Sequence, residues 1–368
     1  MQITGAVLEH DDTAPASHAW TIGPLELDDP GAGELLVRIE VAGVCHSDLS
    51  VVDGSRRRPL PMLLGHEAAG IVERTGDGVD DLAPGTRVVM TFLPRCGRCD
   101  GCRTDGRLPC APGSAANAAG ELVGGGIRLH RRDAQGRPQA VRHHLGVSGF
   151  ATHAVVDRTS VVPVPADVPA DVAALLGCAV LTGGGAVLNA GRPAPGDPVV
   201  VVGLGGVGMA ALLVARALGH DVIGVDAVAA KLDLARQLGA AAAWEPGDAL
   251  DRGVRAPVVV EAAGSARAFE TALALTSPGG TTVTVGLPAP DARAAVSPLT
   301  LTAEARTVIG SYLGSAVPAR DIPRYVDLWR RGLLPLERLI SDRITLADLP
   351  AAMDRLATGA ALRQLIVF

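Results

Sequence analysis

Four consecutive valines at 199–202 run directly into the turn GLGGVG at 203–208, and a long Ala/Leu stretch follows. This is a G-x-G-x-x-G pattern placed between a buried strand and a helix. Gly203 permits the tight turn, Gly205 lets the backbone approach a pyrophosphate, and Gly208 lets helix and strand pack closely. The N–H groups at the start of the helix, beginning at Gly206 and Val207, are left to bind phosphate. The pattern predicts a strand–turn–helix unit of a parallel sheet that binds a dinucleotide.

The segment after this turn favours NAD over NADP. Asp226 closes the next strand, 18 residues after Gly208, where an acid binds the ribose hydroxyls and repels a 2′-phosphate. No arginine follows Asp226 in its loop, and Lys231, the only lysine of the chain, is the first cation. Lys231 either bonds the same ribose from the next helix or is an ordinary solvated helix residue.

Two different residue patterns divide the chain into two regions. Residues 33–45, 68–90 and 150–165 read as short alternating strands with Gly, Pro and Asp turns, which predicts a β-rich region. From about residue 168, apolar strands alternate with helical patterns, which predicts an α/β doubly wound parallel sheet. We expect two domains: residues 1–170 with 314–368, and residues 171–313. Residues 111–126, rich in Gly and Ala, are expected to form a loop.

Length and charge narrow the class of protein. A chain of 368 residues is too long for one typical core. Its net charge of −6 gives no general attraction to nucleic acid. No apolar run reaches membrane-spanning length, and the first residues lack a basic patch followed by an apolar stretch. We therefore expect a cytoplasmic protein that binds neither nucleic acid nor a membrane.

The six cysteines suggest two metal sites with different roles. Four of them form one short run, and four clustered thiolates saturate a tetrahedral zinc, which is a closed structural site. Disulfides are the alternative, but clustered cysteines of the cytosol are more often metal ligands. Cys45 and Cys178 stand alone, and with His66 they offer two thiolates and one imidazole, which leave a fourth position open for chemistry. The four clustered cysteines are Cys96, Cys99, Cys102 and Cys110.

Five landmarks in order resemble the zinc-dependent alcohol dehydrogenases of the medium-chain dehydrogenase/reductase superfamily. They are VCHSD at 44–48, GHEAAG from residue 65, the four-cysteine run, GC at 177–178 and GLGGVG. The resemblance implies a GroES-like β-rich catalytic domain joined to a Rossmann domain. It also implies two zinc ions per chain, NAD, and a catalytic zinc on Cys45, His66 and Cys178 between the domains.

The resemblance assigns further roles around that zinc. Glu67 lies behind the ligands and is an occasional ligand during water exchange, and Asp48 accepts a hydrogen bond from the His66 ring. Ser47 takes the alcohol proton and passes it to the cofactor ribose, since a hydroxyl is donor and acceptor at once. The family often ends this relay on a histidine three residues further on, where this chain has Ser50. The proton then leaves through water or through another group, for which His46 and His144 are the candidates.

Weaker assignments concern the cofactor and the substrate. His46 and Arg363 match residues that contact the cofactor phosphates, and Thr182 and Val207 match residues that pack behind the nicotinamide. Phe92 and Leu145 are either substrate-channel residues or ordinary core.

We expect oxidation of a primary or bulky alcohol by a homodimer, with a tetramer as the alternative. Strand TTVTVGLP at 281–288 is the expected pairing edge. A thiol-dependent formaldehyde dehydrogenase is one alternative, but it needs an acid where this chain has Arg56, followed by Arg57 and Arg58. Those arginines either attract an anionic substrate or form a solvated loop. A zinc protein that only binds NAD or senses redox state is the alternative from another class.

Overall fold

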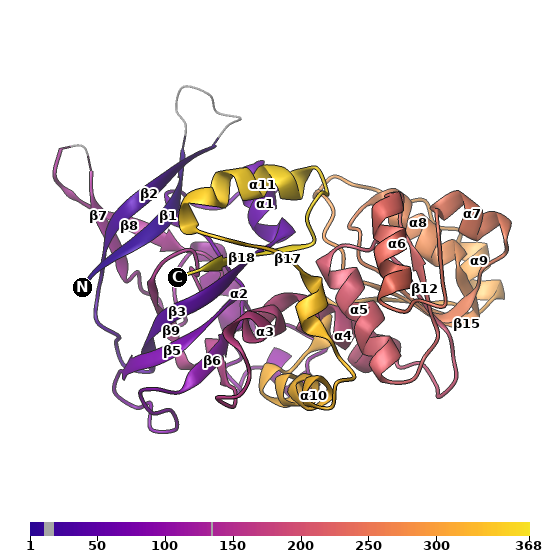
Figure 1. Ribbon diagram of the computed structural model, residues 1–368, viewed down its shortest axis with the longest axis horizontal. Helices are drawn as coiled ribbons and strands as arrows, with labels where there is room; N and C mark the ends of the chain where they lie inside the picture. Colours follow the sequence, from indigo (N-terminus) through magenta and orange to yellow (C-terminus); the bar gives the residue numbers. More distant parts are fainter. Residues whose placement is uncertain (11–17, 134) are drawn as a thin grey trace. The chain divides into compact units, whose positions relative to one another are not determined.

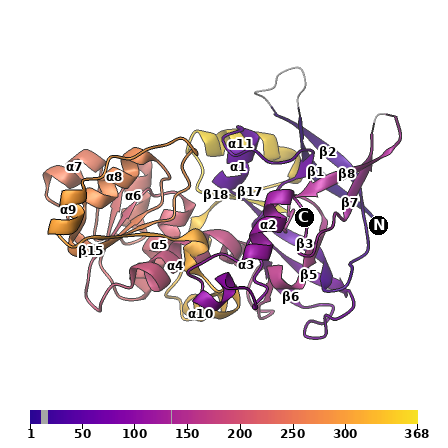
Figure 2. The same ribbon diagram turned by 180° about the vertical axis from the view of Figure 1, so that it is seen from behind.

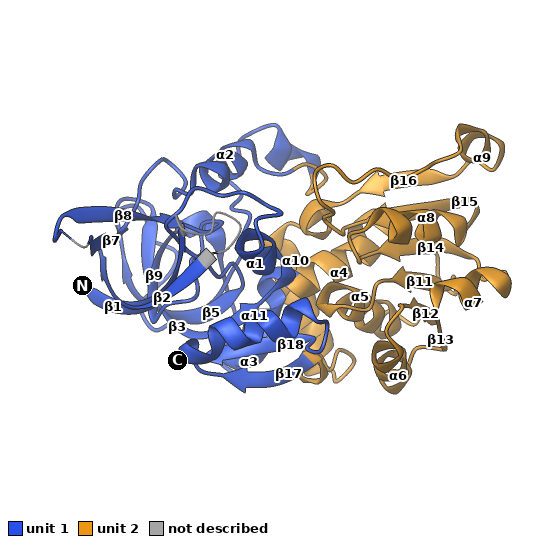
Figure 3. Cartoon of the chain, turned by 90° about the horizontal axis from the view of Figure 1, so that it is seen from above, with its two compact units in different colours: residues 1–104, 109–178, 340–368 blue, residues 105–108, 179–339 orange. Residues whose placement is uncertain are grey.

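A computed structural model describes residues 1–10, 18–133 and 135–368 (Figures 1 and 2). The chain divides into two compact units, coloured separately in Figure 3. Unit 1 comprises residues 1–104, 109–178 and 340–368, and unit 2 comprises residues 105–108 and 179–339.

Unit 1 is β-rich, as predicted. Its strands form a closed barrel and a second sheet in which β9 also pairs with β3. In order, the barrel contains β1 (Gln2–His10), β2 (His18–Leu27), β7 (Leu129–Arg132), β8 (Pro138–His143) and β4 (Met62–Leu63). In order, the second sheet contains β10 (Val161–Pro163), β6 (Arg87–Met90), β5 (Ala68–Thr75), β3 (Glu34–Val44), β18 (Arg363–Val367) and β17 (Ile340–Ile344), with β9 (His153–Asp157).

The helices of unit 1 are few. They are α1 (His46–Val52), α2 (Ala111–Ala119), α3 (Ala170–Leu175) and α11 (Leu349–Ala357). Helix α11 packs against α1, and the two lie side by side in Figures 1 and 2. The core beneath the second sheet is mainly aliphatic, with Leu35, Val37 and Ile39 of β3 almost fully buried. Strand β18 pairs antiparallel with β3, so the end of the chain returns to the first unit as expected.

Unit 2 contains a sheet of six strands whose neighbours all pair in parallel. In order, they are β13 (Ala242–Trp244), β12 (Val222–Val225), β11 (Val199–Val202), β14 (Ala256–Glu261), β15 (Thr276–Thr284) and β16 (Thr307–Gly310). All four valines of β11 are buried, as expected for a central strand covered on both faces. The predicted doubly wound parallel sheet is confirmed.

Helices alternate with these strands along unit 2. They are α4 (Leu181–Gly185), α5 (Gly206–Ala217), α6 (Ala229–Gln237), α7 (Pro246–Asp251), α8 (Ala266–Ala274), α9 (Pro298–Ala303) and α10 (Pro318–Arg330). Helix α5 packs on β11 and β12, and α8 packs on β11, β14 and β15. Eight of the twelve residues of α5 are buried, so this helix is part of the core.

The division into units differs from the predicted boundaries. Residues 314–339 belong to unit 2, and the chain rejoins unit 1 only at Ile340. The reason is that α10 packs on α4, where Gly184 lies so close to Tyr325 that a Cβ would come within 2.7 Å of its hydroxyl. At the other boundary, residues 171–178 stay with unit 1.

Two expectations about local structure were wrong. Residues 111–126 contain the helix α2, which begins after Cys110, has a proline in its first turn and ends at Gly120 with a φ of 70°. The strand at 281–288 is not an edge, because β15 is paired on one side with β14 and on the other with β16. The edge on that side of the described sheet is β16.

Among the residues that the structure describes, one helical segment has the length and composition of a membrane span. It runs from Ala170 to Gly191, with a mean hydropathy of 1.8. However, 89% of its most apolar window is buried within the protein, which is the behaviour of a core helix. The cytoplasmic location stays a prediction.

Candidate functional site

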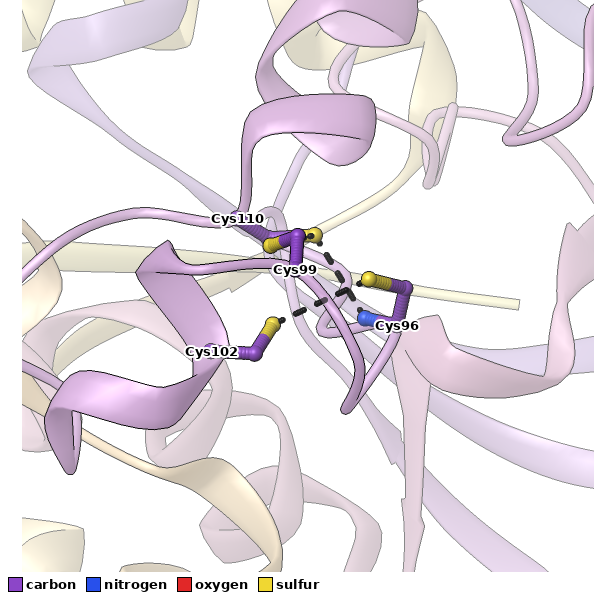
Figure 4. Close-up of side chains that lie close together, drawn as sticks. All are labelled: Cys96, Cys99, Cys102 and Cys110. Atoms are coloured by element: carbon purple, nitrogen blue, oxygen red, sulfur yellow. Dashed lines mark hydrogen bonds between the residues drawn. The ribbon is translucent and has the colours of Figure 1, made fainter.

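The four clustered cysteines converge in unit 1 on the loop around the short helix Gly101–Thr104 (Figure 4). The sulfur atoms of Cys96 and Cys102 are 4.0 Å apart, and those of Cys99 and Cys110 are 3.9 Å apart. All six cysteines of the chain are free, so no disulfide competes for these thiols. The loop therefore presents four sulfur atoms toward one another.

This cluster fits a tetrahedral zinc. Sulfur ligands about 2.3 Å from such an ion lie about 3.8 Å from one another, close to the observed separations. Backbone N–H groups also point at the sulfurs, as they do around thiolates. The N–H of Cys96 donates to Cys110 Sγ at 3.4 Å, and the N–H groups of Cys102 and Ala111 lower the pKa of the Cys99 thiol to about 6. With all four ligands from protein, the site is closed.

A second set of metal ligands lies in unit 1, built from three separate segments. Cys45 precedes α1, His66 lies between β4 and β5, and Cys178 lies in the helical segment after α3. Cys178 Sγ is 3.4 Å from His66 Nε2, and all three ligand atoms lie within 4.8 Å of one another. All three side chains are at least 95% buried. Two sulfurs and one nitrogen at this spacing fit zinc and leave its fourth position open.

The position of Cys178 depends on the residue before it. Gly177 packs against β6 so closely that a Cβ would lie 2.2 Å from the carbonyl oxygen of Met90. Only glycine permits this approach, which brings the neighbouring thiol to His66.

The two thiols of this site shift each other's pKa in opposite directions. The hydrogen bond from Cys178, helped by the charges of Arg363 and His66, lowers the pKa of Cys45 well below its ordinary value. The same contact raises the pKa of Cys178 well above its ordinary value. A cation between the two sulfurs removes this conflict, because it favours both thiolates.

Asp48 orients the ligands from behind. Its Oδ1 accepts a hydrogen bond from His66 Nδ1 at 3.0 Å, and its Oδ2 accepts one from the Cys45 N–H at 3.2 Å. Gly65 N–H also donates to Oδ1, at 3.1 Å. His144 Nδ1 lies 3.2 Å from the same oxygen, outside hydrogen-bond alignment. Burial lowers the pKa of His66, but Asp48 and Cys45 outweigh burial and raise it well above its ordinary value.

Glu67 and Arg363 form a buried pair beside the thiols. Arg363 Nη1 lies 3.5 Å from Glu67 Oε2, and the side chains are 3% and 0% exposed. Neither Glu67 oxygen accepts a hydrogen bond from the residues that the structure describes. Burial raises the pKa of Glu67 to about 7, despite the opposing charge of Arg363. A carboxylate with unfilled acceptor sites next to the ligand set also fits a cation nearby.

The dinucleotide pattern lies at the carboxyl end of β11 in unit 2. Gly203 has a φ of 91°, and a Cβ on Gly208 would lie 1.8 Å from the Gly203 carbonyl oxygen. Asp226, after β12, accepts hydrogen bonds from the N–H groups of Leu204 at 2.7 Å and Val228 at 2.9 Å. The acid thus holds both the turn and its own loop.

Family models match most of the chain. The alcohol dehydrogenase GroES-like domain matches residues 31–166, and the zinc-binding dehydrogenase model matches residues 206–331. The geraniol dehydrogenase of Castellaniella defragrans is 38% identical over 357 residues, covering 94% of each chain. The chain belongs to the zinc-dependent alcohol dehydrogenases of the medium-chain dehydrogenase/reductase superfamily.

Other members of this family are similar over 94% or more of the chain. Alcohol dehydrogenase B of Mycobacterium tuberculosis is 33% identical and covers 94% of each chain. The crystal structure of benzyl alcohol dehydrogenase from Acinetobacter calcoaceticus has a TM-score of 0.90 at 30% identity, covering 100% of this chain and 99% of that one. The predicted family, the GroES-like and Rossmann folds, and the class of enzyme are confirmed, with zinc and a nicotinamide cofactor as the family's requirements.

The remaining predicted residues of this alcohol dehydrogenase are placed as follows. His46, Ser47 and Ser50 lie on α1, and Ser50 Oγ donates to the His46 carbonyl oxygen at 2.9 Å. Ser47 is half-buried, whereas His46 is exposed. Arg363 faces Glu67, and its predicted phosphate contact stays a prediction.

On unit 2, Thr182 of α4 and Val207 of α5 lie on helices in close contact. A Cβ on Gly183 would lie 2.2 Å from the Val207 carbonyl oxygen. Lys231 is in the first turn of α6.

The predicted channel residues lie in unit 1. Phe92 and Leu145 are buried, and the Phe92 ring meets the His66 ring edge-on with centroids 5.4 Å apart. Among the three arginines, Arg58 donates to the Asn117 carbonyl oxygen at 3.3 Å, so it is tied to α2. Glu261 was not among the predicted residues, and its signal in the sequence is a lone acid that ends the apolar strand VVVE.

Proposed function

We propose that this chain is a zinc- and NAD-dependent alcohol dehydrogenase that interconverts a bulky, apolar primary alcohol and its aldehyde. The observation that carries the proposal is the convergence of Cys45, His66 and Cys178, with 3.4 Å between Cys178 Sγ and His66 Nε2. Three protein ligands leave one zinc position for substrate. Zinc bound there supplies a Lewis acid that lowers the pKa of an alcohol, and NAD supplies the hydride acceptor.

The choice of a bulky alcohol rests on two supports. One is the naming of two similar proteins as geraniol and benzyl alcohol dehydrogenases. The other is the apolar neighbourhood of the candidate ligands, where Phe92 contacts the His66 ring and Leu145 is 6% exposed.

NAD rather than NADP is supported by Asp226. Its carboxylate, fixed by Leu204 and Val228 N–H groups, carries a charge that repels a 2′-phosphate. A second, structural zinc on the four-cysteine cluster is supported by its sulfur spacing of 3.9 and 4.0 Å.

Ser47 is our choice for the group that accepts the alcohol proton and passes its own towards the cofactor ribose. It lies two residues after Cys45 and directly before Asp48. A hydroxyl performs both transfers because it is donor and acceptor at once. The dimer is also a proposal, with β16 as the pairing edge in place of the strand that we expected.

The test is an initial-rate panel with the purified full chain. Geraniol, benzyl alcohol and ethanol are each offered with NAD and with NADP, and zinc is counted per chain. We expect two zinc ions, NADH formation with geraniol or benzyl alcohol, and loss of turnover in Cys178→Ser. Equal rates with NADP would contradict the assignment of Asp226.

Two further measurements distinguish this function from the two alternative functions. Formaldehyde oxidation that requires glutathione would favour the thiol-dependent enzyme. One zinc per chain with no turnover on any alcohol would favour a non-catalytic NAD-binding protein.

A further inference from the structure

A buried carboxylate at the end of β14 has no role in the chemistry above. Glu261 is 1% exposed and accepts hydrogen bonds from three donors. Its Oε1 accepts from the N–H groups of Ala263 at 2.9 Å and Gly264 at 2.7 Å, and its Oε2 accepts from Thr284 Oγ1 at 2.8 Å. A carboxylate is an acceptor only, so its environment of donors is matched to it.

These bonds join the loop after β14 to the last residue of β15, at the carboxyl ends of the two strands. Ala263 and Gly264 follow β14, whereas Thr284 ends β15. The main-chain carbonyl of Glu261 adds a second link, because it accepts from the N–H groups of Val285 at 2.9 Å and Gly286 at 3.2 Å. Glu261 therefore holds the loop after β14 and the loop after β15 at the same time.

The dinucleotide turn packs closely on the loop after β14, and that loop packs closely on the loop after β15. A Cβ on Gly203 would lie 2.5 Å from the Ala263 nitrogen, and a Cβ on Gly286 would lie 2.3 Å from the Gly264 nitrogen. The loops after β11, β14 and β15 thus contact one another in series. A shift of the middle loop, which Glu261 fixes, must displace its neighbours.

These three loops lie at the place where parallel sheets bind their ligands. Strand β11 pairs with β12 on one side and with β14 on the other, and ligands bind outside the carboxyl ends of strands at such a reversal of strand order. From the β12 side, Asp226 holds the turn through Leu204 N–H at 2.7 Å. From the β14 side, Glu261 holds the loop that packs on Gly203.

We propose that Glu261 is a positioning residue for the dinucleotide cofactor, which fixes the loops after β14 and β15 in the shape that binds it. This inference rests on the proposed NAD-dependent function. Glu261 acts through Ala263, Gly264 and Thr284 and does not itself touch the cofactor.

Four variants distinguish the role of the Glu261 oxygen atoms as hydrogen-bond acceptors from the roles of the size and charge of the side chain. Glu261→Ala leaves two backbone N–H groups without their acceptor. Glu261→Gln keeps one oxygen for those groups and turns an amide donor toward Thr284 Oγ1, which also accepts. Glu261→Asp keeps the charge but shortens the side chain by one carbon. Thr284→Val removes only the bond to the second loop.

The measurement is the dissociation constant for NADH, followed by fluorescence with the full chain, together with the unfolding temperature without cofactor. If the loops hold the binding shape one tenth of the time in Glu261→Ala, NADH binds about 10-fold more weakly. We expect Glu261→Gln to bind within about 3-fold of the original chain, and Glu261→Asp to fall between Gln and Ala, on the same reasoning. Thr284→Val should lose less than Glu261→Ala, because the two N–H contacts nearest Gly203 remain.

Three outcomes would overturn the inference: unchanged NADH affinity in Glu261→Ala, a Gln variant as weak as the Ala variant, or a lowered unfolding temperature without a change in affinity. If Glu261→Ala does not fold, the Asp and Gln variants decide, and equal affinity of the two overturns the inference. Failure of the proposed function is distinct, since it appears as absence of NADH binding by the unchanged chain.

Discussion

At the candidate zinc site, one buried carboxylate orients two ligands that are distant in sequence. Asp48 accepts from the ring of His66 at 3.0 Å and from the backbone of Cys45 at 3.2 Å. Burial raises the pKa of Asp48, but the charge and hydrogen bond of His66, together with the neighbouring His144 ring, outweigh it and lower that pKa. An ionised Asp48 fixes the Nδ1–H tautomer of His66, so that Nε2 faces the metal position.

Asp48→Asn is therefore expected to weaken zinc binding at this site by about 10- to 100-fold. The amide presents one acceptor instead of two, so either His66 or Cys45 loses its partner. Competition with a chromophoric chelator measures the effect, and zinc on the four-cysteine cluster is an internal reference. His143→Gln is the matched control, because His143 is equally buried but accepts from the Arg128 N–H at 3.0 Å. Unchanged zinc affinity in Asp48→Asn would refute this role.

At the scale of elements, the helical segment Ala170–Gly191 delivers Cys178 to the site because glycine lets it approach β6. Gly177→Ala places a Cβ 2.2 Å from the Met90 carbonyl oxygen, so the helix must shift. We expect a loss of about 1–3 kcal/mol in the free energy of unfolding, and weaker zinc binding because Cys178 moves with the helix. Chemical denaturation and chelator competition measure the two effects.

Gly247→Ala is the control for that substitution. Gly247 lies in α7, and nothing lies within 4 Å of an added Cβ. Alanine is the better helix former, so stability should stay constant or rise by up to about 1 kcal/mol. If Gly177→Ala matched this control in both measurements, the close approach to β6 would not position Cys178.

The elements that the sequence predicted well are those whose pattern is dictated by burial. The four valines of β11 and the eight buried residues of α5 form continuous apolar runs, as expected of a central strand and a core helix. Helix α2 was not predicted, because its Ala and Gly residues give no apolar periodicity and the evidence for its ends lies in Cys110 and Gly120. Strand β16 was missed because it is only four residues long and none of its side chains is fully buried.

At the scale of the whole molecule, the residues that were predicted are those whose chemical type reveals their role. Those that act through contacts between distant segments were not predicted. Cysteines and histidines in motif order predict the ligand sets, since few other roles need these residue types. Glu261 and the boundary at Ile340 were not predicted, because their roles depend on contacts between segments distant in sequence. Glu261 acts through loops after two strands, and the boundary reflects the packing of Tyr325 on Gly184.

The edge of unit 2 bears on assembly. Strand β16 pairs only with β15 within the described sheet, and apolar side chains around it are exposed: Leu299 by 77%, Leu287 by 45% and Val308 by 39%. An unprotected edge with apolar neighbours favours pairing with a second copy. We expect Leu299→Asp with Val308→Lys to convert the proposed dimer to a monomer, because both charges must be desolvated in the interface.

Size-exclusion chromatography with light scattering measures the mass directly. Leu250→Asp is the matched control, since Leu250 is also 39% exposed but lies on α7, which packs beside β13 at the opposite edge. The control should remain a dimer. A double variant that kept the dimeric mass would exclude β16 as the interface. A monomeric unchanged chain would remove the dimer from the proposal without affecting the zinc and dinucleotide sites, since no residue assigned to either site lies on β16.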